Sequence, residues 1–170
     1  MATTQQLLFL PEWSIQGDGT ELGAGVTVTK SSAATPTPHF SVGSYDASVK
    51  NVLQWKDRMP ADYSSGLVAK VQWHSTGAAD AVVWACYLAA MTPATDRIDN
   101  KAFAAVNQAT GSVHATANTV VETSITMTNA DSVAAGDLII VSLWRLPGDA
   151  ADTSAALALF DVLALEYQTP

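Results

Sequence analysis

The sequence is poor in charged residues. Only 14% of its 170 residues are Asp, Glu, Lys or Arg, against about 25% in an average soluble domain. The 8 basic and 16 acidic side chains give a formal net charge of −8. This balance argues against nucleic acid and against an anionic membrane surface as partners, because both attract Lys and Arg. Because monomers usually cover themselves with charge, the shortage also favours an oligomer or burial in a larger assembly.

Cysteine and long apolar runs are scarce as well. The single cysteine, Cys86, excludes a disulfide framework and a zinc site built on thiolates. The longest uncharged apolar run, residues 81–91, is too short to cross a bilayer. The sequence does not begin with basic residues followed by an apolar stretch, which is the pattern of a secretory signal. These absences leave a soluble acidic domain that needs no metal or disulfide for stability.

Motifs for catalysis or cofactor binding are also missing. The glycines at 17 and 19 begin a dinucleotide fingerprint, but its sixth position is Leu22 and a strand pattern follows. No Ser lies in a nucleophile elbow, and Cys86 lies in the most apolar stretch, where a thiol is normally inert. We therefore expect no enzyme, no catalytic residue and no cofactor.

Metal and acid-pair motifs are equally weak. The run from Asp96 to Asn100 alternates oxygen ligands as a calcium loop does, but Lys101 and Asn107 break the EF-hand pattern. Two acidic pairs next to turns could serve a glycosidase only if the fold set their spacing, namely Asp57 with Asp62 and Asp149 with Asp152. The three histidines are far apart in the sequence, so we expect no metal site: His39, His74 and His114.

From His39 onward the pattern is typical of short strands separated by turns. Apolar residues alternate or run continuously in residues 52–57, 67–74, 81–91, 113–128, 138–146 and 156–167. Turn residues between these stretches predict an all-β antiparallel sandwich or barrel. Residues 99–109 could instead form one short helix.

Three of the predicted strands are apolar on both faces, namely 81–91, 138–144 and 155–167. A sandwich strand normally has one polar face, so the second face needs a cover from a loop of the same chain or from a neighbouring subunit. We favour the subunit. The predicted interface residues are Val82, Trp84, Tyr87, Leu88, Ile140 and Trp144.

The first 38 residues differ from the rest. A short apolar run ends at Pro11, glycines follow, and residues 31–38 form a polar connector. This pattern predicts an N-terminal arm that contributes one strand, or else an ordinary outer strand with loose connections. Trp13 lies in this segment, and four further tryptophans lie in strand patterns, where a core or interface position is commoner than a sugar-binding platform.

Residues 38–168 resemble small virion proteins of tailed bacteriophages. The resemblance is carried by residues 38–46, by WKDRMPADYSSGL at 55–67, by VVWACY at 82–87, by AGDLI at 135–139 and by DAADT at 149–153. It implies a jelly-roll domain at 39–170 behind an arm at 1–38. It further implies a homotrimeric capsid cement protein that binds the major capsid protein on the outer surface of the virion, after synthesis in the host cytoplasm.

In this interpretation the arm contacts the capsid through Leu7, Leu8, Phe9, Leu10 and Trp13. Two alternatives remain open. One is a trimeric tail-fibre or receptor-binding tip protein, which would bind host glycans through exposed aromatic residues. The other is a carbohydrate-binding module.

Overall fold

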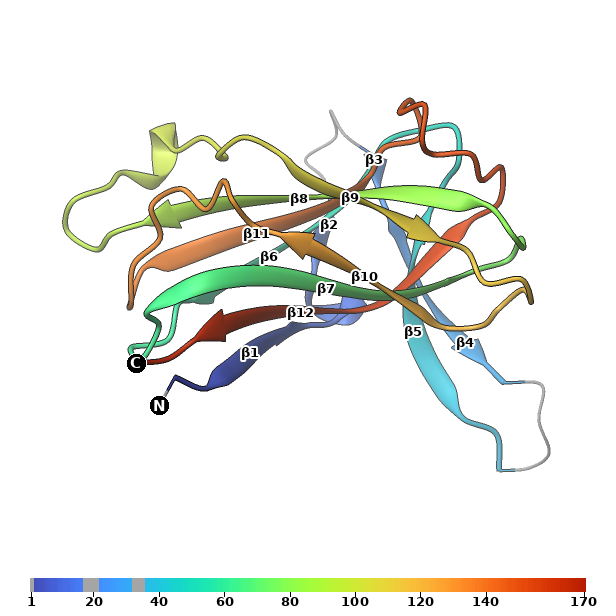
Figure 1. The fold of residues 1–170 in the computed structure, drawn as a ribbon, viewed down its shortest axis with the longest axis horizontal. Coiled ribbons are helices and arrows are strands. Elements are labelled where there is room, and N and C mark those ends of the chain that lie inside the picture. Colours follow the sequence, from blue (N-terminus) through green and yellow to red (C-terminus); the bar gives the residue numbers. More distant parts are fainter. Residues whose placement is uncertain (1, 17–21, 32–35) are drawn as a thin grey trace.

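The computed structural model describes residues 2–16, 22–31 and 36–170 as two packed β-sheets (Figure 1). Sheet A is six-stranded, with the order β10-β7-β12-β5-β4 and with β1 also paired to β12. Sheet B is six-stranded, with the order β2-β6-β11-β8-β9 and with β3 also paired to β6. The first four strands are β1 (Thr4–Phe9), β2 (Ile15–Gln16), β3 (Leu22–Gly23) and β4 (Gly25–Lys30). The others are β5 (His39–Tyr45), β6 (Asn51–Arg58), β7 (Ser65–Ser75), β8 (Ala81–Met91), β9 (Asn107–Ser112), β10 (Val121–Thr126), β11 (Leu138–Arg145) and β12 (Ala158–Gln168).

Strands β5 to β12 form a jelly roll. Within sheet A they lie in the order β10-β7-β12-β5, and within sheet B in the order β6-β11-β8-β9. The chain thus crosses repeatedly between two antiparallel four-stranded layers, which is the jelly-roll arrangement of eight strands. The predicted fold class is confirmed, and the first of these strands begins at His39, where the sequence indicated a change of pattern.

The described residues of the N-terminal segment pair with strands of their own chain. Strand β1 pairs with β12 from Thr4↔Gln168 to Phe9↔Leu163, and β4 pairs with β5 along its whole length. Short strands β2 and β3 pair with β6. The reason is the alternation in β1, which places Leu7 and Phe9 against the core. Part of the predicted arm, at 1, 17–21 and 32–35, lies outside the described residues.

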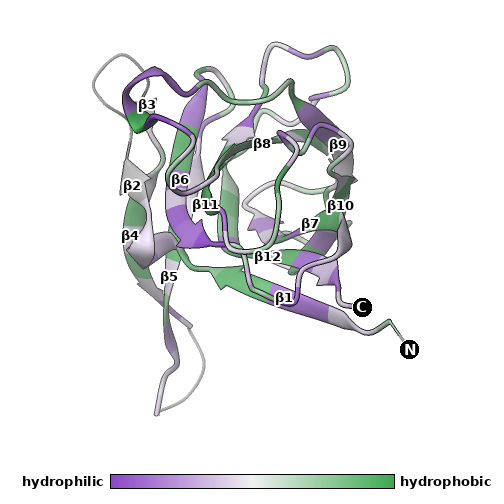
Figure 2. Ribbon diagram, turned by 90° about the vertical axis from the view of Figure 1, so that its left-hand side faces the viewer, coloured by the Kyte–Doolittle hydropathy of each residue, from purple (hydrophilic) through white to green (hydrophobic). Residues whose placement is uncertain are grey.

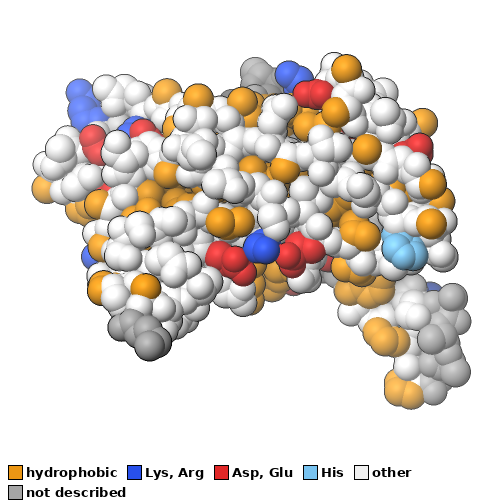
Figure 3. Space-filling model, in the orientation of Figure 1, with side chains coloured by type: hydrophobic (Ala, Val, Ile, Leu, Met, Phe, Trp, Pro, Cys, Tyr) orange, Lys and Arg blue, Asp and Glu red, His pale blue; other side chains and the backbone are white. Residues whose placement is uncertain are grey.

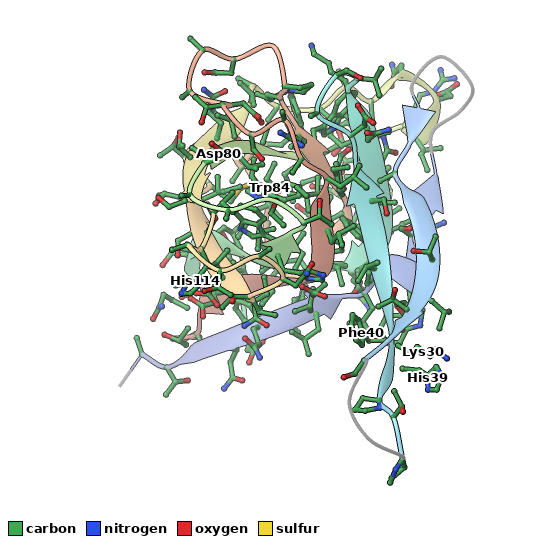
Figure 4. All side chains as sticks on the ribbon, turned by 90° about the vertical axis from the view of Figure 1, so that its right-hand side faces the viewer. Lys30, His39, Phe40, Asp80, Trp84 and His114 are labelled. Atoms are coloured by element: carbon green, nitrogen blue, oxygen red, sulfur yellow. The ribbon has the colours of Figure 1, made fainter. Side chains whose placement is uncertain are left out.

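Aromatic and aliphatic side chains from both sheets fill the space between them. Trp73 of β7 meets Trp84 of β8 with ring centroids 5.6 Å apart, and Tyr45 meets Trp84 at 4.9 Å. Trp84 lies in the middle of the molecule (Figure 4). Viewed end-on, the strands surround this core (Figure 2). The alternation predicted for residues 67–74 is confirmed for the inner face, because Leu67, Ala69, Val71 and Trp73 are all buried, although His74 on the outer face is buried as well.

The helix considered for residues 99–109 is wrong. Residues Ile98–Asn100 form a single 3₁₀ turn, and the chain then runs extended into β9. The Ala104 amide donates to the Leu88 carbonyl at 2.9 Å, which holds this segment along the edge of β8. Pairing with β8 therefore overrides the helical preference of the alanines. In the described residues no helix is long and apolar enough to cross a membrane.

The β4–β5 hairpin projects from one end of the sandwich, beyond the other strands (Figures 1 and 2). The face drawn in Figure 3 carries few charged side chains, and hydrophobic side chains are visible over this hairpin. A pocket forms where this hairpin meets the body of the molecule.

Candidate functional site

A pocket of about 870 Å³ opens where the β4–β5 hairpin meets the outer face of sheet A. We call it the hairpin pocket. It is lined by the hairpin, by the short 3₁₀ helix η1 (Pro11–Trp13) with the residue before it, by β7 and β12, and by the connection before β10. Its volume is in the range of small-molecule binding sites, about 300–1,000 Å³.

One wall of the hairpin pocket is apolar. Phe40 of β5 is 40% exposed, and its ring meets the His74 ring edge-on at 6.4 Å. Leu10, Val120 and Leu159 supply the rest of the apolar lining. The backbone at Leu10 is fixed in place, because its carbonyl accepts a hydrogen bond from Trp55 Nε1 at 2.8 Å.

The floor of the pocket carries a buried histidine paired with a carboxylate. His74 Nδ1 donates to Asp161 Oδ2 at 2.9 Å, and the two side chains are 8% and 22% exposed. Both residues lie on the outer face of sheet A, on the neighbouring strands β7 and β12. The histidine is therefore held in one orientation, with its Nδ1 as the donor.

The remaining lining is polar and mixed in charge. Lys30 comes from the end of β4 and Glu12 from η1, while Asn118 reaches the pocket from the connection before β10. The backbone N–H of Asn118 donates to the Ser75 carbonyl at 2.7 Å, which ties that connection to β7. Figure 4 shows Lys30 and Phe40 close together on the hairpin. Thr29 and Thr76 also line the site.

Two features of the sequence belong to this site, and neither predicts it alone. His74 lies on the outward phase of its strand, and the sequence indicated only that it is far from the other histidines. Asp161 is one of only two acids in an otherwise apolar final strand. Neither feature indicates the other, so the pair was not predicted.

The five predicted capsid-contact residues differ in their accessibility. Leu8 and Trp13 are 49% and 66% exposed. Phe9 is buried in the core and cannot contact a partner, which corrects that prediction. Leu7 is half-buried against the core, and Leu10 lines the hairpin pocket. Only Leu8 and Trp13 therefore offer large apolar surfaces.

Three of the six predicted interface residues are wrong. Val82, Trp84 and Leu88 have no exposed surface in the single chain. They lie on the inner face of β8, within the core between the sheets. The error was one of phase, because both faces of this strand are apolar and the sequence does not distinguish them.

The other three, Tyr87, Ile140 and Trp144, lie half-buried on the outer face of sheet B. Tyr87 contacts Trp144 with ring centroids 5.7 Å apart, and Phe103 from the connection after β8 packs on Tyr87 at 6.0 Å. A loop of the same chain thus covers part of this face, which was the alternative to a subunit. A contact between this face and a second subunit stays a prediction.

Three residues considered for catalysis are buried or engaged in structural contacts. Burial raises the pKa of the Cys86 thiol from 9.0 to about 12, so it stays protonated near neutral pH. Asp152 is ion-paired with Arg145 in the interior, and both carboxylate oxygens of Asp149 accept hydrogen bonds. The glycines at 17 and 19 lie outside the described residues.

The residues considered for metal binding are not gathered into a site. Asp96 accepts a hydrogen bond from the Thr92 amide, and Asp99 pairs with Arg97. His39 lies on the hairpin, far from His114 (Figure 4). Among the residues that the structure describes, no group of three or more His, Cys, Asp or Glu is placed to hold a metal ion.

Comparisons with known proteins give a likeness in fold alone. No family model matches the chain, and no curated protein matches it. Among solved structures, it is similar to a carbohydrate-binding module of the β-sandwich superfamily, with TM-score 0.39 and 9% identity over 99% of this chain and 56% of that one. It is also similar to TmCBM61 in complex with β-1,4-galactotriose, with TM-score 0.41 and 13% identity over 96% of this chain and 86% of that one.

A third structure, the non-crystalline-cellulose-specific module CBM28, has TM-score 0.44 and 7% identity over 93% of this chain and 87% of that one. This chain spans little more than half of the first of these structures. At such scores the likeness bears on neither ligand nor activity, so a function has to be argued from this chain's own residues.

Proposed function

We propose that this protein is a non-catalytic binding domain that holds a neutral carbohydrate in the hairpin pocket. The observation that supports this proposal is the lining of the pocket. Phe40 offers an aromatic surface, while His74, Asp161 and Asn118 offer polar groups within the same space. A sugar has both apolar C–H faces and hydroxyls that donate and accept, so it can use both kinds of lining.

The charges at the pocket favour a neutral ligand over an anionic one. Lys30 is opposed by the two carboxylates of Glu12 and Asp161, and the chain as a whole has a net charge of −8. An anion would approach through an unfavourable potential. Nucleotides, phosphorylated metabolites and acidic polysaccharides are therefore poorer candidates than neutral oligosaccharides.

The test is binding of the purified full chain to immobilised and free neutral oligosaccharides, with calorimetry on those that bind. Phe40→Ala removes the aromatic wall and is expected to weaken binding about tenfold or more. Val28→Ala is the matched control, because Val28 is 73% exposed on the other face of the same hairpin. Equal binding by both variants would contradict the pocket as the site.

The same samples are checked for hydrolysis, because Glu12 and Asp161 both line the pocket. A non-catalytic domain releases no reducing sugar. Release that is lost in Asp161→Asn would overturn the non-catalytic part of the proposal. Failure of the unmodified chain to bind any neutral glycan would overturn the whole.

A second candidate is the virion role, a trimeric cement protein on the outer capsid surface. The resemblance in sequence supports it, and so do Leu8 and Trp13, two large apolar side chains exposed in the N-terminal segment. The partner would be the major capsid protein. A tail-tip location is the variant of this candidate that also uses a glycan site.

Testing the virion role calls for substitution and not truncation. Deleting the first residues would remove β1 and with it the buried Phe9. The double substitution Leu8→Ser with Trp13→Ser leaves β1 intact and is expected to abolish binding to phage heads that lack the protein. Unchanged binding to heads would refute the contact role, and binding to host cells alone would favour the tail tip.

A further inference from the structure

Asp161 reaches the hairpin pocket because β12 is irregular at that residue. In the pairing of β12 with β7, Phe160 lies opposite Trp73 and Val162 lies opposite Gln72, so Asp161 is an extra residue without a partner. Such a β-bulge bends the strand and redirects a side chain, and bulges are common next to functional sites. Here the bulge places a carboxylate beside the outward-facing His74.

The Asp161 carboxylate is only partly satisfied by the protein. His74 Nδ1 donates to Oδ2 at 2.9 Å, and the hydrogen bonds among the described residues include no donor to Oδ1. The side chain is 22% exposed, and it lines the pocket. A charged oxygen that is partly removed from water and lacks a donor favours a ligand that supplies one.

The chemistry of this oxygen restricts the ligand. An ionised carboxylate can only accept hydrogen bonds, so the group facing Oδ1 must carry a proton. A sugar hydroxyl does, whereas the carboxylate of a uronic acid or a phosphate oxygen near neutral pH is repelled. Glu12 adds a second negative charge to the lining, and Lys30 is the cation that opposes it.

We infer that Asp161 is the specificity-determining residue of the hairpin pocket, where Oδ1 accepts a hydroxyl of a neutral sugar and excludes acidic sugars. His74 is a positioning residue that holds Oδ2 and thereby aims Oδ1 at the ligand. This inference rests on the proposed carbohydrate-binding function and names the residues that select within it.

The experiment compares affinities for maltotriose, cellotriose, galactotriose and trigalacturonic acid. For the neutral trisaccharide that the unmodified chain binds best, Asp161→Asn is expected to lose at least tenfold, while affinity for trigalacturonic acid rises or stays unchanged. Asp161→Ser is a second variant with the same expectation. Glu166→Gln is the matched control, because Glu166 lies on the same strand but does not line the pocket.

The role of His74 is tested by rescue. Asn places a side-chain N–H near the position of His Nδ1, so His74→Asn is expected to keep most of the preference for the neutral sugar. His74→Leu fills the buried site without a donor, and is expected to lose that preference. Melting curves for all variants separate a loss of selectivity from a loss of folding.

The outcomes distinguish failure of the proposed function from failure of the role of Asp161. If the unmodified chain binds none of the neutral trisaccharides, the proposed function is contradicted for them. If it binds one, and Asp161→Asn or Asp161→Ser binds it equally with an unchanged ratio to trigalacturonic acid, the role of Asp161 is overturned and the function stands. Equal selectivity in His74→Leu and His74→Asn would remove His74 from the site's mechanism.

Discussion

Arg145 is a cation with no contact to solvent. Its Nη2 and Nε donate to Asp152 at 2.7 and 3.0 Å, and its Nη1 donates to the Ala156 carbonyl at 2.7 Å. Asp152 in turn accepts from the Val83 amide at 3.0 Å. A buried ion pair is tolerated when its hydrogen-bonding capacity is filled in this way. The pair therefore anchors the long connection between β11 and β12 to the body of the fold.

Removing one member of this pair should be costly. Asp152→Asn leaves the Arg145 charge buried without a counter-charge, and is expected to lower the free energy of unfolding by about 3–5 kcal/mol. Asp99→Asn is the control, because the Arg97–Asp99 pair is largely exposed and should change stability by less than about 1 kcal/mol. Denaturant unfolding of both variants measures the difference. Similar small losses in both would contradict the structural role.

Cys86 should be unreactive in the folded protein. Its pKa is raised by burial from 9.0 to about 12, so little thiolate forms and the sulfur is not accessible. A thiol reagent in mildly alkaline buffer is expected to modify it only after addition of guanidinium chloride. Rapid reaction without denaturant would mean that β8 opens readily.

The same shift makes stability depend on alkaline pH. Between 9.0 and about 12 the unfolded thiol is ionised while the folded thiol keeps its proton. The folded state binds more protons in this window, so stability falls as pH rises, by about 1.4 kcal/mol per pH unit for one such group. Tyr45, whose pKa burial also raises, adds to the loss. Chemical unfolding at a series of alkaline pH values measures the slope, and a flat profile would contradict the shift.

At the scale of the element, the strands followed from the sequence more readily than the site did. The predicted stretch 81–91 coincides with β8, and the strands at 67–74 and 138–146 differ from β7 and β11 by two residues or fewer at either end. Alternation and turn residues carry that information locally. The His74–Asp161 pair depends on a bulge and on the alignment of two strands that are far apart in the sequence. Neither leaves a local sequence pattern.

The bulge at Asp161 leads to an expectation about deletions in β12. Deleting Asp161 removes the extra residue, so Leu163, Leu165 and Tyr167 keep facing the core and the protein should still unfold cooperatively. Deleting Ala164 instead turns Leu165 and Tyr167 outward, at about 1.5–3 kcal/mol for each large side chain exposed. Thermal unfolding followed by circular dichroism compares the two. Loss of folding on deletion of Asp161 alone would mean that the bulge is structurally essential.

In the whole molecule, burial within the single chain partly explains the shortage of charged residues. Most of the second apolar face of β8 is buried, with Ala85 having no exposed surface and Met91 only 4%, while Tyr87 is half-buried. The apolar side chains that remain most exposed lie apart from one another along the chain, at Trp13, Val28 and Ile98. The sequence alone does not show whether a loop or a second subunit covers an apolar strand face, because either kind of cover needs the same apolar residues.

The virion role predicts a trimer in solution. Sedimentation equilibrium should give three times the chain mass of 17.8 kDa, with no change when the hairpin pocket variant Phe40→Ala is used. A mass of one chain at micromolar concentration would contradict the trimer, and would weaken the virion-shell role more than the glycan-binding role. Because the two proposed roles differ in this way, the mass is the first measurement to make.

The pairing of β1 with β12 brings the first and last described strands together. Thr3 Oγ1 and Thr169 Oγ1 are 2.8 Å apart, and the Thr169 amide donates to the Thr3 carbonyl. Both ends lie on the opposite side of the molecule from the β4–β5 hairpin (Figure 1). If either end is attached to another domain or to a surface, the hairpin therefore faces away from the point of attachment. The two ends could also be joined by a short linker and the chain reopened elsewhere, without disturbing that geometry.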